Sequence, residues 1–129
     1  MGLFDNFLKS AAEGENVSKV SWVALTDKNQ LDEIISLSNA KPVLIFKHST
    51  SCGISRMSLK SFEREFDLKE AEISLYFLDL LSYRALSNEI SEKFVVTHQS
   101  PQVLVIKNGK VIYNDSHHSI SVNDIKKIL

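Results

Sequence analysis

The fold is decided by the stretch PVLIFKHSTSCGIS, which occupies residues 42–55. Residues 43–46 are a continuous apolar run, which is typical of a strand covered on both faces of its sheet. After a short polar bridge, residues 52–66 repeat apolar side chains at helical spacing. The stretch therefore predicts a central strand, a loop and a helix that begins at Cys52. The apolar stripe predicted for this helix is Ile54, Met57 or Ser58, Leu59 or Phe62, and Phe66.

Strands and helices alternate on both sides of this stretch. Before it, residues 20–25 are rich in strand formers, and Thr26 and Asp27 offer a cap for an amphipathic helix. After it, residues 74–79 predict another buried strand and residues 82–94 another helix. Strands joined through helices are typically parallel, so these units predict a parallel sheet.

The end of the chain departs from this alternation. Residues 102–106 and 110–113 flank Asn108-Gly109, a strong signal of a tight hairpin. An amphipathic helix over residues 122–129 follows. An antiparallel hairpin at the edge of a parallel sheet gives an α/β architecture in which helices flank a central mixed sheet. This order of elements matches the thioredoxin-like fold.

The residues before the first strand predict an extension. A short helix at the start would carry four apolar residues on one face: Leu3, Phe4, Phe7 and Leu8. The polar, glycine-containing segment that follows suits a linker. We expect a short N-terminal helical extension over residues 1–16 and one thioredoxin-like domain over residues 17–129, a length usual for a single domain.

Composition argues against several functions and locations. The formal net charge is -1, and lysine and arginine are scattered, so the sequence predicts no basic patch that could bind nucleic acid. The longest apolar runs are only about one strand long, which excludes a membrane-spanning helix. A single cysteine permits no disulfide within the chain, and no export leader is recognisable. We therefore expect a cytoplasmic protein without nucleic-acid or membrane partners.

Cys52 is the candidate reactive group. A thiol reacts as the thiolate, which the unpaired N–H groups and the dipole at a helix N-terminus favour. Cys52 follows a buried strand and should lie at the carboxyl end of the sheet, where open α/β sheets place their sites. Lys47 and His48 add positive charge or donors nearby, and the Ser49, Thr50 and Ser51 hydroxyls are expected to cap the helix. The alternative is an inert buried cysteine.

Ser100-Pro101 is the second candidate feature. Proline cannot donate to a sheet ladder, yet this one directly precedes an apolar strand. We predict a cis peptide bond here and a loop in contact with the Cys52 sulfur, as in thioredoxin-like folds. An ordinary trans proline that opens an edge strand is the alternative.

Three segments together resemble one family. FKHSTSCGIS at residues 46–55, HQSPQ at residues 98–102, and Ser116-His117 with Ile120 look like the signatures of the monothiol bacilliredoxins, the YtxJ-like thioredoxin-fold proteins. The resemblance runs from about Trp22 to the C-terminus. The family often has proline directly after the cysteine, where this chain has Gly53.

The resemblance implies a protein that removes bacillithiol, a low-molecular-weight thiol, from mixed disulfides on other proteins. Its partners would be S-thiolated clients, that thiol as co-substrate, and a recycling thiol or reductase. Ser55 stands where a two-cysteine oxidoreductase carries its resolving cysteine, so exchange must be intermolecular. We expect Cys52 to be catalytic and nine residues to activate the thiol or bind substrate: Lys47, His48, Ser51, Gly53, Ser55, His98, Ser100, Pro101 and His117.

Two other functions fit parts of the sequence. Cys52-Gly53-Ile54-Ser55 differs by one residue from the Cys-Gly-Phe-Ser signature of monothiol glutaredoxins, which resemble iron–sulfur carriers. Against this, no Gly-Gly pair follows the hairpin, and Ser100 replaces the usual valine. A non-catalytic adaptor of the same fold is the third interpretation. The histidines show no metal-ligand spacing, so we expect neither a metal nor a bound cofactor.

Overall fold

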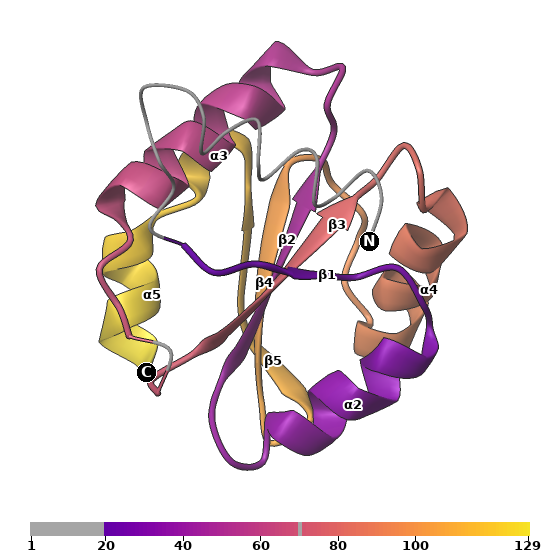
Figure 1. The fold of residues 1–129 in the computed structure, drawn as a ribbon, viewed down its shortest axis with the longest axis vertical. Coiled ribbons are helices and arrows are strands. Elements are labelled where there is room, and N and C mark those ends of the chain that lie inside the picture. Colours follow the sequence, from indigo (N-terminus) through magenta and orange to yellow (C-terminus); the bar gives the residue numbers. More distant parts are fainter. Residues whose placement is uncertain (1–19, 70) are drawn as a thin grey trace.

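The computed structural model describes residues 20–69 and 71–129. The helical extension predicted over residues 1–16, and the predicted start of the domain at residue 17, lie outside these ranges. Two layers of helices enclose one central sheet (Figure 1). This arrangement confirms the predicted thioredoxin-like α/β fold.

The sheet has five strands in the order β1-β3-β2-β4-β5. Strands β1, β3 and β2 run parallel, and β4 and β5 join antiparallel to them as a hairpin. Asn108 and Gly109 in the hairpin turn have φ of 52° and 75°, as a tight turn of this type requires. The strand bounds are Val23–Ala24 (β1), Val43–His48 (β2), Ser74–Asp79 (β3), Gln102–Lys107 (β4) and Lys110–Ser116 (β5).

Helices cover both faces of the sheet. The first face carries α2 (Asn29–Leu37) and α4 (Arg84–Phe94), and the second carries α3 (Gly53–Glu65) and α5 (Val122–Ile128) (Figure 1). A short 3₁₀ turn, His117–Ser119, links β5 to α5. The helices predicted over residues 52–66, 82–94 and 122–129 match α3, α4 and α5 to within two residues at each end. The N-cap residue of α2 is Lys28, so the N-cap position predicted at Thr26 or Asp27 is wrong.

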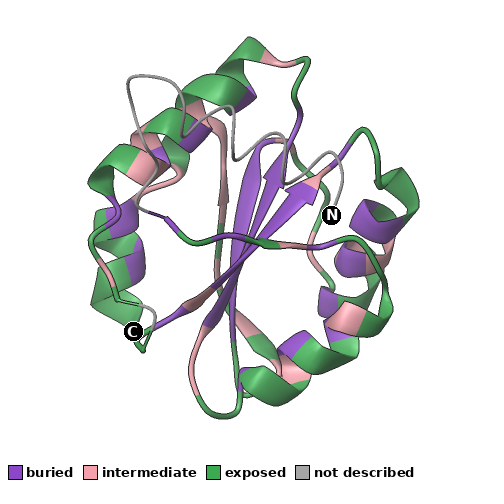
Figure 2. Cartoon of the chain, viewed as in Figure 1, coloured by how far each residue is buried: buried purple, intermediate pink, exposed green. Residues whose placement is uncertain are grey.

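Strand β2 is the centre of the molecule. Its residues Val43, Leu44, Ile45 and Phe46 are completely inaccessible to solvent, and Figure 2 shows the sheet as the main buried layer. Successive side chains of a strand point to opposite faces. Val43 and Ile45 pack with α2 and α4, whereas Leu44 and Phe46 pack with α3 and α5. The same alternation sends Lys47 toward α4 and His48 toward α3.

The first strand is shorter than predicted. The strand is limited to Val23–Ala24, which pairs with β3, and Leu25 N adds a hydrogen bond to the Phe77 carbonyl at 2.8 Å. Trp22 lies just before the strand, and its ring is packed against three phenylalanines at centroid distances of 5.5 to 5.8 Å: Phe46, Phe62 and Phe77. Its indole Nε1 donates to Glu63 Oε2 of α3 at 2.8 Å. Side-chain packing, not ladder pairing, therefore holds the start of this segment.

Candidate active site

Cys52 is the N-cap residue of α3. Its backbone is extended, with φ −106° and ψ 121°, and its carbonyl accepts the first helical bond from Arg56 N at 3.1 Å. The residue is free and half-buried, unlike the enclosed core residues of the same helix. A sulfur at this position lies beside N–H groups that have no acceptor within the helix. The thiol is therefore partly exposed at the start of the helix, where a reactant can reach it.

The serine and threonine hydroxyls before Cys52 do not cap α3, so that prediction is wrong. The loop closes as a turn in which Cys52 N donates to the Ser49 carbonyl at 3.2 Å, and this turn makes Cys52 itself the N-cap. The Ser49 and Ser51 hydroxyls lie 3.3 Å from each other instead. The N-cap side chain makes no capping hydrogen bond. No side chain therefore caps the N-terminus of α3, where Cys52 is the N-cap residue.

The apolar stripe of α3 also differs from the prediction. Its buried residues are Ser55, Leu59 and Phe62, whereas Ile54 is 43% exposed. Because the helix begins at Gly53, the side chain at position 54 points away from the sheet and the one at position 55 points toward it. Ile54 thereby becomes part of the surface beside the thiol.

Ser55 and His48 form a buried hydrogen-bonded pair under the Cys52 loop. Ser55 Oγ accepts from Ser49 N at 3.0 Å and lies 2.8 Å from His48 Nδ1. With Nδ1 as the acceptor, the serine hydroxyl donates to it. Burial lowers the pKa of His48 to about 4, aided by Arg56 and opposed by Asp79. His48 is therefore neutral near pH 7, so of the positive charge or donor predicted at this position the charge is absent.

Lys47 turns to the other face of the sheet. Its Nζ lies 3.4 Å from the Ser87 carbonyl and 3.2 Å from Ser91 Oγ, both on α4. It also lies 3.3 Å from His98 Nδ1, in the loop that leads to Pro101. Burial lowers the pKa of Lys47 to about 8, which leaves the amine mostly protonated at neutral pH. Its contact with His98 brings the positive charge next to the loop that leads to Pro101.

The Ser100-Pro101 peptide bond is cis, which confirms the prediction. The Pro101 carbonyl accepts from His117 N at 3.1 Å, and the His117 carbonyl accepts from Ser58 Oγ of α3 at 3.2 Å. His117 has a positive φ of 54°, unusual for a non-glycine residue. The proline loop is thus tied to the helix that begins with Cys52. Contact between Pro101 and the Cys52 sulfur stays a prediction.

Ser100 carries a buried hydroxyl that no other described residue hydrogen-bonds. Leaving such a group without a partner costs on the order of 1–3 kcal/mol. Gly53 is the other open position, since a β-carbon there would meet nothing closer than Arg56 Nη2 at 3.8 Å. Ser51 is exposed on the same loop. Gly53 and Ser51 therefore leave open space on either side of Cys52.

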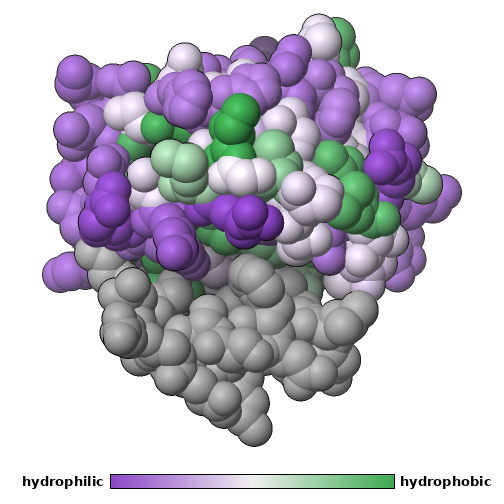
Figure 3. All heavy atoms as spheres, turned by 90° about the horizontal axis from the view of Figure 1, so that it is seen from above, coloured by the Kyte–Doolittle hydropathy of each residue, from purple (hydrophilic) through white to green (hydrophobic). Residues whose placement is uncertain are grey.

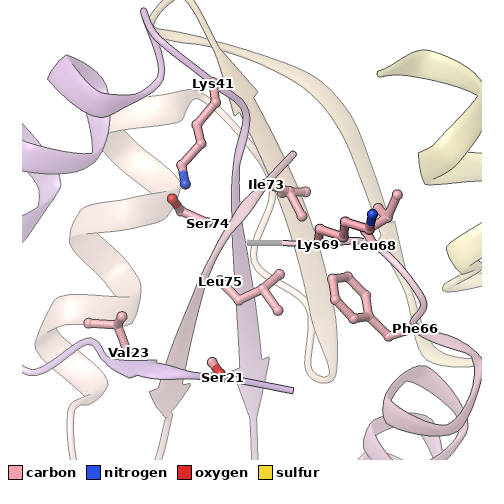
Figure 4. Close-up of a pocket in the computed structure, with 9 residues that line it drawn as sticks. All are labelled: Ser21, Val23, Lys41, Phe66, Leu68, Lys69, Ile73, Ser74 and Leu75. Atoms are coloured by element: carbon pink, nitrogen blue, oxygen red, sulfur yellow. The ribbon is translucent and has the colours of Figure 1, made fainter. Parts of the chain in front are cut away.

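One cavity lies away from the thiol. It measures about 590 Å³ and opens near the amino ends of β2 and β3, where Lys41, Phe66, Ser74 and Leu75 line it (Figure 4). No cysteine or histidine contributes to it. Within residues 20–69 and 71–129, no three His, Cys, Asp or Glu side chains gather closely enough to hold a metal ion. Cys52 lies at the opposite end of the sheet, beyond the carboxyl end of β2.

Ser87 and Ser91 were not singled out from the sequence. They lie four residues apart on the sheet-facing side of α4, beside the buried Leu86 and Ile90. Two serines at this spacing within an apolar stripe are the signal that a buried polar partner lies opposite.

None of the described helices is long and apolar enough to cross a membrane.

A reachable cysteine at the start of a helix and a cis-proline loop tied to that helix define a thioredoxin-fold thiol–disulfide oxidoreductase. A family model described as "Monothiol bacilliredoxin BrxC" matches residues 23–125. The chain belongs to this family of thiol–disulfide oxidoreductases.

Solved structures agree with this assignment. A protein described as "a putative oxidoreductase with a thioredoxin fold" is 30% identical, with a TM-score of 0.70 over 82% of this chain and 91% of its own. A Malassezia sympodialis thioredoxin is 18% identical, with a TM-score of 0.64 over 90% and 94% of the two chains. Spinach chloroplast thioredoxin f is 14% identical, with a TM-score of 0.60 over 84% and 83%. The latter two support the fold alone.

The buried, neutral His48 predicts a loss of stability in acid. Its pKa is about 4 when folded and 6.5 otherwise, so the unfolded chain binds more protons between these values and stability falls as the pH drops. Between pH 7 and pH 4.5 we expect wild type to lose about 2 kcal/mol more than His48→Asn, in which Asn Oδ1 replaces Nδ1. Urea unfolding at the two pH values measures this. The exposed His118→Asn should behave as wild type, and equal losses in all three proteins would contradict the account.

The buried amine of Lys47 predicts that removing it stabilises the fold. Methionine fills a similar volume without a charge. The groups that contact the amine keep other partners, since Ser91 Oγ also donates to the Ser87 carbonyl and His98 Nδ1 also lies within hydrogen-bond distance of Ser87 Oγ. We expect Lys47→Met to raise the free energy of unfolding at pH 7 by about 1–3 kcal/mol. The gain should shrink as the pH rises from 8 to 10.5, where the unfolded lysine also loses its proton. Guanidinium unfolding tests this, and a destabilised variant at pH 7 would refute it.

Proposed function

We propose that the protein removes bacillithiol from mixed disulfides on client proteins, with Cys52 as the attacking thiol. The observation that carries the proposal is the single free cysteine at the N-cap of α3. Three residues further on, Ser55 is fully buried and engaged with His48 and Ser49. No second thiol is present to complete an internal disulfide, so Cys52 must pass its adduct to another molecule.

The reaction is a thiol–disulfide exchange. The Cys52 thiolate attacks the bacillithiol sulfur, a new S–S bond forms, and the client sulfur leaves with the electron pair of the broken bond and takes a proton from water. The client cysteine is thereby reduced and Cys52 oxidised. A second low-molecular-weight thiol then attacks the mixed disulfide on Cys52, which releases a small disulfide and restores the thiolate. Each step exchanges one S–S bond for another.

The surface beside the thiol suits a protein client. Ile54 and Met57, in the first turns of α3, are 43% and 66% exposed. Seen from above, apolar patches lie among hydrophilic side chains at the edge toward which β2 and β3 point (Figure 3). Exposed apolar side chains around a reactive group favour contact with another protein.

The proposal predicts that Cys52 alone is chemically required. A client carrying the bacillithiol adduct, incubated with stoichiometric protein, should lose the adduct mass as Cys52 gains it. Cys52→Ala should abolish transfer. Ser55→Ala should largely keep it, while losing about 1–3 kcal/mol of stability because Ser49 N and His48 lose their shared partner. Intact-protein mass spectrometry measures the transfer.

The exposed Ser119→Ala serves as the matched serine control and should match wild type in both measurements. A client that keeps its adduct, or equal removal by Cys52→Ala, would refute the redox role and favour the adaptor. Transfer from a glutathionylated client alone would favour the glutaredoxin-like alternative.

A further inference from the structure

Lys47 is a buried cation with no anionic partner among the described residues. It is fully inaccessible to solvent, and the three groups that contact its Nζ are all uncharged: a carbonyl, a hydroxyl and an imidazole nitrogen. The ion pairs of the described chain join other lysines, Lys93 and Lys126, to aspartates. A buried charge of this kind is costly to the fold unless something compensates it. Its position therefore calls for a functional reason.

His98 connects this buried charge to the surface. An ammonium group can only donate, so His98 Nδ1 accepts from Lys47, and Ser87 Oγ lies 3.3 Å from the same nitrogen. The proton of the neutral ring is then on Nε2. The residue itself is exposed. The ring thus has an N–H donor on the side that Lys47 and Ser87 do not occupy.

His98 also lies three residues before the cis-proline Pro101. Burial, and after it the nearby positive charges, lower the pKa of His98. The N–H donor of the ring and the buried charge of Lys47 therefore lie together in the segment that leads to Pro101, the loop that is tied to the Cys52 helix.

We propose that Lys47 and His98 form a binding site for a carboxylate of the low-molecular-weight thiol. The identity of this ligand rests on the proposed function. His98 Nε2 donates to the carboxylate, and Lys47 supplies the charge that lacks a partner within the described fold. Bound in this way, the ligand compensates the buried amine only while it occupies the site. The buried Lys47 thus lowers the stability of the free protein and makes the site selective for anionic disulfides.

The test compares small disulfides that differ in charge. We use dithiodiglycolate, which carries two carboxylates, neutral bis(2-hydroxyethyl) disulfide and cationic cystamine. The second-order rate constant for adduct formation on Cys52 is measured by mass spectrometry at low salt. We expect Lys47→Met to lower the ratio of the anionic to the neutral rate constant at least 10-fold, and His98→Ala to lower it several-fold. The ratio of the cationic to the neutral rate constant should rise or stay level.

Lys107→Met is the charge-matched control, because Lys107 is exposed at the far end of β4. It should keep the wild-type ratio within twofold. An unchanged ratio in Lys47→Met and His98→Ala would overturn the proposal, and so would an equal loss with all three probes, since that result means that the two residues only hold the loop.

A binding measurement separates this site from the exchange reaction. In Cys52→Ala, which cannot react, adding dithiodiglycolate should shift the His98 ring signals in NMR spectra, and Lys47→Met in the same background should reduce the shift. No shift would refute the site whatever the protein does to clients. A bacillithiolated client that keeps its adduct, beside a clear His98 shift, would refute the proposed function and leave the carboxylate site in place.

Discussion

The complete burial of β2 on both faces is the constraint on which the rest of the structure depends. Its four apolar residues, 43–46, divide between two cores, and this alternation fixes where the next two side chains must point. His48 is sent under the Cys52 helix and Lys47 toward the proline loop. The strand therefore supports the thiol loop on one face and places a positive charge on the other.

The two polar residues at the end of β2 have different tasks. His48 is neutral and shares Ser55 with the thiol loop, so it shapes the backbone that leads into α3. Lys47 lies near His98 and has no counterion within residues 20–69 and 71–129. A fold gains stability from the first arrangement and loses it through the second. This contrast is why we assign structure to His48 and ligand binding to Lys47.

Sequence patterns predicted the elements better than the site. The apolar run of β2, the spacing in α4 and Asn108-Gly109 are local signals, and each led to the observed element. The cis bond at Ser100 also followed from a proline before a buried strand. The Ser49, Thr50 and Ser51 hydroxyls do not cap α3 as predicted. The turn that makes Cys52 the N-cap depends on a hydrogen bond from Ser49 N to Ser55 Oγ, across the start of the helix, which the local sequence does not reveal. The faces toward which Lys47 and His48 point could not be predicted without the topology of the sheet. Strand alternation places the two side chains on opposite faces, but it does not say which helix covers which face.

The central claim is that Cys52 accepts bacillithiol from other proteins. It is tested most directly in a cell that makes this thiol, by exposing the cell to an oxidant, quenching with acid and measuring the intact mass of the protein. We expect a fraction of molecules to be heavier by one bacillithiol, with the adduct located on Cys52 by fragmentation and lost on reduction. Protein that stays unmodified while other proteins in the same lysate carry the adduct would contradict it.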